Sequence, residues 1–123
     1  MEARDLAVGL SGGRIAVGVV SLLAPGLVGR AMLVPGGDSG GVRFFLRVVG
    51  ARDLALGVGV LVALDRNGPV RGWLQASAVA DGLDAAGSLL ARRHLRRPVF
   101  PAATAAATGG ALVSGWLAGQ LDA

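Results

Sequence analysis

An arginine and an aspartate stand side by side in the middle of a long apolar run. The run extends over residues 44–64, and Arg52-Asp53 lies near its centre. An unpaired charge is costly in apolar surroundings, so both side chains need partners of opposite charge. The first and third apolar runs carry charges at comparable positions, namely Arg14, Asp81 and Asp84. We predict that the chain folds so that these five side chains meet.

The composition favours an apolar environment for the whole chain. Of its 123 residues 53% are hydrophobic and 16% charged, whereas an ordinary soluble domain carries about 25% charged residues. There are 21 glycines, mostly inside the apolar runs, a habit typical of packed membrane helices. The absence of cysteine excludes disulfides and thiol chemistry. The start of the chain is not basic and its first apolar run contains Arg14, so we expect no cleaved signal peptide.

Four helices are expected, because four apolar runs approach the roughly 20 residues that cross a bilayer. They are placed at residues 6–24, 42–64, 70–91 and 99–121. A short surface helix or turn is expected from Pro25, and Gly- and Pro-rich loops at residues 35–41 and 65–69. The length of the chain allows a single domain.

Polar and small residues form a minority stripe on each predicted helix. The stripes are Ser11, Arg14, Gly18 and Ser21; Gly50, Asp53 and Gly57; Ser77, Asp81, Asp84 and Ser88; and Thr104, Thr108, Ala111 and Gly115. Soluble helices have a wide charged face, but here most of each surface is apolar. We therefore predict an all-α, four-helix transmembrane bundle with short loops, a multi-pass protein of the cell membrane surrounded by lipids. The alternative is a soluble bundle that hides its apolar faces in an oligomer.

Two further spacings bear on helix packing. Gly9 and Gly13 lie four residues apart, a spacing that suits either a phosphate loop or close packing of helices. A phosphate loop would need a preceding strand and a following lysine, and both are missing. Close packing of helices is therefore expected there. Gly115 and Gly119 repeat the spacing in the last helix and suggest a seam for a homo-oligomer.

The arginines predict the orientation in the membrane. Seven flank the first and third connections: Arg30, Arg43, Arg47, Arg92, Arg93, Arg96 and Arg97. Three lie on the other side: Arg4, Arg66 and Arg71. Because cytoplasmic loops carry the excess of positive charge, both termini are expected outside the cytoplasm. The basic run at 92–97 lies between apolar runs, which favours contact with lipid headgroups over nucleic acid.

The chain also resembles a known family. Residues 50–57, Gly-Ala-Arg-Asp-Leu-Ala-Leu-Gly, and residues 81–84, Asp-Gly-Leu-Asp, are similar to motifs of small integral membrane proteins catalogued as domain of unknown function 4267. The resemblance extends over nearly the whole chain. It implies a four-helix membrane fold and no particular activity.

The five charges are the candidate functional residues, since ionisable groups inside a membrane helix are rare and usually functional. In one interpretation Arg14, Arg52, Asp53, Asp81 and Asp84 only hold the helices in register. In a second they bind a small lipophilic or anionic ligand, because a guanidinium holds carboxylates and phosphates. In a third, Asp81, Asp84 and Arg52 serve a membrane-embedded acid/base enzyme such as an isomerase or cyclase.

We expect no metal and no cofactor. His94 is the single histidine and lies in the basic loop, and aspartate oxygens alone make an improbable metal site. Within the charged group, Arg52 is predicted to pair with Asp84 or Asp81 more than with its neighbour Asp53, because consecutive helical residues point about 100° apart.

Overall fold

The structure is a computed structural model that describes residues 2–32, 38–90 and 99–121, with side chains of the last range from Thr104 onward. Five helices and no strand occur in those residues. They are α1 (Ala3–Leu23), α2 (Pro25–Ala31), α3 (Gly40–Asp65), α4 (Val70–Leu90) and α5 (Val99–Gln120). The all-α prediction is confirmed, and the four long helices lie within a few residues of their predicted ranges. The short fifth helix is the one expected from Pro25.

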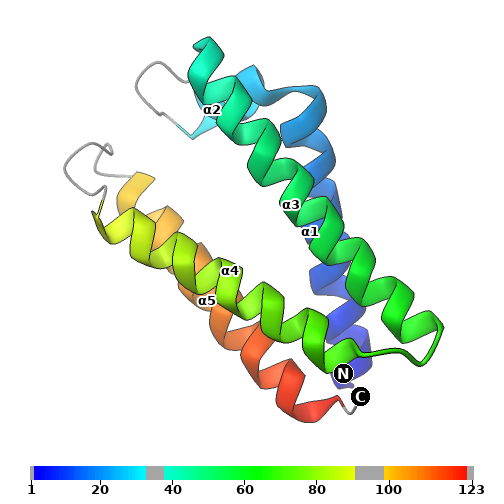
Figure 1. Cartoon of the computed structure of the whole chain (residues 1–123). Coiled ribbons are helices and arrows are strands. Elements are labelled where there is room, and N and C mark those ends of the chain that lie inside the picture. The colour runs from blue at the N-terminus through cyan, green and yellow to red at the C-terminus, as the bar shows by residue number, and fades with distance from the viewer. Residues whose placement is uncertain (1, 33–37, 91–98, 122–123) are drawn as a thin grey trace.

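The helices form two arms that meet at one end and diverge toward the other (Figure 1). The N-terminal arm consists of α1, α2 and α3, and the C-terminal arm of α4 and α5. Most contacts between helices lie within an arm, α1 against α3 and α4 against α5. We call the end where the arms meet the closed end and the other the open end; both termini lie at the closed end (Figure 1).

Glycines bring α1 and α3 into close contact. A Cβ atom on Gly50 would lie 2.8 Å from the carbonyl oxygen of Gly18 and 2.8 Å from Cβ of Ser21. A Cβ on Gly57 would lie 2.8 Å from the carbonyl oxygen of Ser11. Real side chains do not tolerate such distances, so the two backbones approach as closely as they do because these positions are glycine. The predicted strip of Gly50 and Gly57 is confirmed as a packing face.

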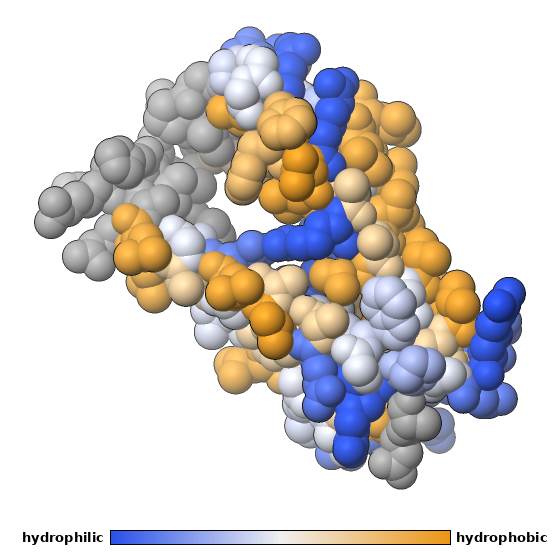
Figure 2. All heavy atoms as spheres, viewed as in Figure 1, coloured by the Kyte–Doolittle hydropathy of each residue, from blue (hydrophilic) through white to orange (hydrophobic). Residues whose placement is uncertain are grey.

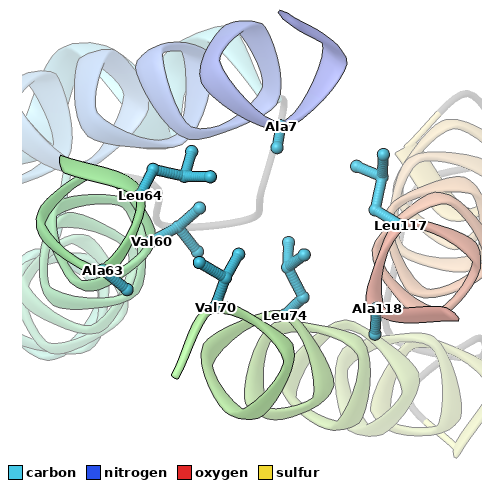
Figure 3. Packing of buried hydrophobic residues seen from close by; sticks show 8 residues of the cluster. All are labelled: Ala7, Val60, Ala63, Leu64, Val70, Leu74, Leu117 and Ala118. Atoms are coloured by element: carbon cyan, nitrogen blue, oxygen red, sulfur yellow. The ribbon is translucent and has the colours of Figure 1, made fainter. Parts of the chain in front are cut away.

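A small apolar core joins the arms at the closed end. All four long helices contribute to it, as Figure 3 shows. Its buried residues are Ala7, Val60, Ala63, Leu64, Val70, Leu74, Leu117 and Ala118. Nearby, α3 ends in a tight turn: Asn67 has a φ of 52°, and the amide of Gly68 donates to the carbonyl of Ala63 at 2.7 Å. This left-handed residue after the helix terminates α3 and turns the chain into α4.

The outward surface of the helices is rich in large apolar side chains (Figure 2). Leu23, Phe44, Leu83 and Leu112 are each more than three-fifths exposed. Among the described residues, α1 is the one helix whose length and composition suffice to cross a membrane. Two of the other long helices are interrupted by charge, with Arg47, Arg52, Asp53 and Asp65 along α3 and Arg71, Asp81 and Asp84 along α4.

Two predictions about small residues need correction. On α5 the inward side chains are those of Ser114, Leu117 and Ala118, whereas Thr108 and Gly115 of the predicted stripe are exposed. The apolar core at the closed end, and not the hydroxyl pattern, orients this helix, because Leu117 and Ala118 belong to that core. Gly9 and Gly13 are likewise exposed, and a Cβ added at either would have no atom within 4 Å, so close packing of α1 depends on Gly18 instead.

The short connection between α3 and α4 predicts antiparallel neighbours, and the two helices do contact each other. They pack at the closed end and then separate, because each helix finds its main partner within its own arm. The residues that bridge the separated part are the charged ones.

A charged cluster between the two arms

The five predicted charges form one connected network, which we call the charge cluster: Arg14, Arg52, Asp53, Asp81 and Asp84. Three long helices supply them, α1, α3 and α4. Arg14, the Arg52-Asp53 pair and Asp81 lie near the midpoints of their helices. Both arms start from the closed end, so the midpoints of α1, α3 and α4 lie at a similar distance from that end, which is why charges so distant in sequence meet.

Arg14 is the centre of the cluster. Its Nη1 donates to Oδ1 of Asp53 at 3.2 Å and to Oδ1 of Asp81 at 3.1 Å, and its Nη2 donates to Oδ2 of Asp81. The guanidinium thus holds Asp81 with two parallel bonds, the strongest geometry for this pair. The three side chains are 9%, 13% and 10% exposed, so this half of the cluster is nearly buried. It ties both long helices of the N-terminal arm to α4.

Arg52 forms the outer half of the cluster. Its Nη1 and Nη2 donate to the two oxygens of Asp84 at 2.9 and 2.7 Å, and Nη2 also donates to Asp53 at 3.1 Å. The prediction that Arg52 pairs with an aspartate of the next long helix is confirmed, with Asp84 as the partner. Its neighbour Asp53 is a secondary partner. Because Asp53 accepts from both arginines, it links the two halves.

Exposure rises from the inner to the outer half. The side chains of Arg52 and Asp84 are 32% and 42% exposed, several times the values around Arg14. Figure 2 shows hydrophilic side chains that cross an opening between the two arms, with hydrophobic side chains along parts of its border. Arg52 and Asp84 form the half of the cluster that is more accessible from outside.

The hydrogen-bonding capacity of the cluster is not fully used. In the part of the chain that the structure describes, Oδ2 of Asp53 accepts no hydrogen bond, although its side chain is only 13% exposed. The Nε of Arg52 has no partner either among those residues, but it is shielded from solvent. The cluster therefore offers an incoming molecule unused carboxylate lone pairs.

Gly110 of α5 is a site residue that sequence reasoning missed. A Cβ at this position would lie 2.6 Å from Oδ2 of Asp81. The backbone of α5 thus packs directly against the carboxylate that Arg14 holds, which only glycine permits without displacement. Gly110 is one of several small residues in α5, so no signal in the sequence distinguished it.

One further residue of the predicted stripe on α4 has its partner outside the cluster. Ser77 is buried on α4 but donates to the carbonyl oxygen of Trp73, four residues earlier, at 3.0 Å. His94 and the basic run at 92–97 lie outside the described residues. No group of three or more histidine, aspartate or glutamate side chains arranged to hold a metal occurs among the described residues. The aspartates of the cluster are oriented toward guanidinium groups instead.

Comparison of the chain with protein-family models, with curated proteins and with solved structures returned no match. The functional interpretation therefore depends on the geometry of the cluster and on the surface around it.

Proposed function

We propose that the protein is a four-helix integral membrane protein of the kind catalogued as domain of unknown function 4267. In this proposal the charge cluster holds the two arms in register at mid-membrane. The outer half of the cluster also binds a small lipophilic molecule that enters between the arms. One observation carries the proposal: five charges within three long helices converge on one network while the outward surface stays rich in apolar side chains.

Helix lengths support the membrane assignment. At 1.5 Å per residue, the 21 residues of α1 and of α4 extend about 32 Å, close to the roughly 30 Å of a bilayer's hydrocarbon core. The charges inside α3 and α4 oppose insertion of either helix alone. Their cost falls when Arg52 and Asp84 pair, so these helices are suited to insertion as a paired unit.

The arrangement of the helices also predicts the orientation of the protein in the membrane. Both termini lie at the closed end, as expected for an even number of crossings. Arg30, Arg43 and Arg47 belong to the opposite end of the N-terminal arm, which we assign to the cytoplasmic side. Reporter fusions at residue 123 test this assignment, and activity of a reporter that functions only in the cytoplasm would reverse it.

Alkaline carbonate washing tests membrane integration. An integral protein stays with the membrane pellet under these conditions. Release of a monodisperse soluble species would instead support the oligomer that hides its apolar faces.

Ligand binding is tested by mass spectrometry of small molecules retained by protein purified in a mild detergent. Ser88 lies one helical turn beyond Asp84 toward the open end, so Ser88→Phe is expected to obstruct the opening and remove the retained molecule. Gly72→Phe places the same side chain on the same helix at an exposed position with no atom within 4 Å, and should retain it. Absence of any retained molecule from the unaltered protein would leave the cluster with its structural role alone.

A membrane-embedded acid/base enzyme is the second candidate. The observation that favours it is the exposure of Asp84, because general acid–base catalysis needs a titratable group that a substrate reaches. The same extraction separates the two candidates. A binder releases the molecule in the form in which it was taken up, whereas an enzyme releases a mixture of substrate and product that Asp84→Asn abolishes.

A further inference from the structure

We propose that the molecule bound between the arms is a lipophilic amine, with its ammonium group at Asp84 and Asp53 and its apolar part toward the open end. The inference rests on the proposed function and specifies the chemical class of its ligand. Three observations carry it: the charge balance of the cluster, the unused carboxylate oxygens and the apolar borders of the opening.

The charge cluster carries more carboxylates than guanidiniums. Arg14 and Arg52 face Asp53, Asp81 and Asp84, so the formal charge is two positive against three negative, or −1. No other arginine among the described residues forms an ion pair with these aspartates. A surplus charge in a low-dielectric setting attracts a cation and repels an anion. The balance thus selects an ammonium over a carboxylate or phosphate.

The unused hydrogen-bond acceptors belong to Asp53 and Asp84. Asp81 is nearly buried and both its oxygens accept from Arg14. Asp53 has one oxygen without a donor among the described residues, and Asp84, the most exposed member, accepts one bond at each oxygen and retains lone pairs. Arg52 lies between them and bonds to both. An ammonium carries three N–H donors, which suits two neighbouring carboxylates.

The N–H group of Arg52 without a partner does not favour binding of an anion. Its Nε is shielded from solvent, so a molecule entering the opening does not reach it. The terminal nitrogens of Arg52 are already engaged with Asp84 and Asp53. An anion would have to displace these carboxylates and add to the surplus negative charge.

The face of α3 that carries Arg52 suits an apolar chain. Phe45 and Val48 precede Arg52 by seven and four residues, which places them on its face of α3 toward the open end. They are 63% and 51% exposed. This strip extends about 10 Å from the guanidinium at 1.5 Å per residue. A ligand with a cationic head and an alkyl chain matches both the cluster and the strip.

A site-specific label tests the inference, and the absence of cysteine makes the labelling unique. Ser88→Cys carries an environment-sensitive fluorophore beside the opening, and the protein in mild detergent is titrated with dodecylamine, dodecanol or dodecanoate. Dodecylamine is expected to give a saturable change, with dodecanol weaker by about tenfold or more, since a charge-assisted hydrogen bond is lost. Dodecanoate is expected to bind most weakly.

Two variants locate the ammonium. Asp84→Asn is expected to weaken dodecylamine about tenfold while leaving dodecanol unchanged, and Asp65→Asn, at the exposed end of α3, is the matched control that changes neither. Asp53→Asn keeps an acceptor for the arginines and serves the same purpose if Asp84→Asn does not fold. Amine binding that neither Asp84→Asn nor Asp53→Asn alters would overturn the inference.

The pattern across probes separates this inference from the proposed function. Equal affinity for the three probes, or a preference for dodecanoate, refutes the amine but leaves a site for lipophilic molecules. No binding of any probe counts against both.

Discussion

Replacing Arg14 with leucine should destabilise the protein more than any other single change in the charge cluster. Arg14 is 9% exposed and is the only arginine bonded to Asp81 among the described residues. The leucine side chain fills part of the space but leaves two nearly buried carboxylates without this partner. The formal charge of the cluster falls from −1 to −2, with Arg52 alone facing three aspartates.

The magnitude follows from exposure. Breaking a buried ion pair by removing one partner costs about 3–5 kcal/mol, whereas exposed pairs contribute about 0–1 kcal/mol. Arg14 belongs to the first class. Arg52→Leu should cost about 2 kcal/mol, between the two classes, because Arg52 and Asp84 are 32% and 42% exposed. The expected order is therefore Arg14→Leu, then Arg52→Leu.

Equilibrium unfolding in mixed detergent micelles measures these values, with helical circular dichroism as the signal. Arg30→Leu is the matched control: Arg30 is exposed on α2 and should change stability by less than about 0.5 kcal/mol. The double variant Arg14→Leu/Asp81→Leu removes the buried pair together. It should be more stable than the sum of the single effects predicts by about 0.5–3 kcal/mol, the range for residues in direct contact.

The reasoning fails if Arg14→Leu is no more destabilising than Arg52→Leu, since the expected order depends on the burial of the inner half. It also fails if the effects of Arg14→Leu and Asp81→Leu are additive. Additivity would mean that the two side chains do not share an interaction in the folded protein.

Two further predictions concern the arms. Gly50→Ala should destabilise the protein in the same unfolding assay, because the added Cβ lies 2.8 Å from the backbone of α1. In the control Gly9→Ala the added Cβ meets no atom within 4 Å, so this change should be neutral or stabilise by up to about 1 kcal/mol. Equal effects of the two substitutions would contradict the close approach of α1 and α3. Nitroxides are attached to cysteines introduced at Phe45 and Leu90, near the diverging ends of the arms. The distribution of distances between them should broaden when Arg52→Leu removes the pair with Asp84. An unchanged distribution would show that this pair does not restrain the arms.

Much of the candidate site was predictable because charges in apolar helices have few acceptable surroundings. Arg14, Asp53 and Asp81 had to find opposite charges, and their positions at helix midpoints made one another the available partners. The faces of α1 and α4 were predictable for the same reason, since the helical period assigns neighbouring polar residues to one stripe. On α5, which carries no charge among its described side chains, that constraint is missing: Thr104 and Ala111 of the predicted stripe are half-buried, whereas Thr108 and Gly115 are exposed.

The sequence by itself thus determined the helices, the apolar character of their outward surfaces and the membership of the charge cluster. Only the tertiary structure decided which carboxylate binds which guanidinium, because an arginine side chain is long enough to reach several neighbours. It also decided that α1 packs on α3 through Gly18 and Gly50 and that α4 packs on α5. The divergence of these two arms, which leaves Asp84 accessible and Asp81 buried, depends on how whole helices cross, and residue spacing along one helix carries no information about that angle.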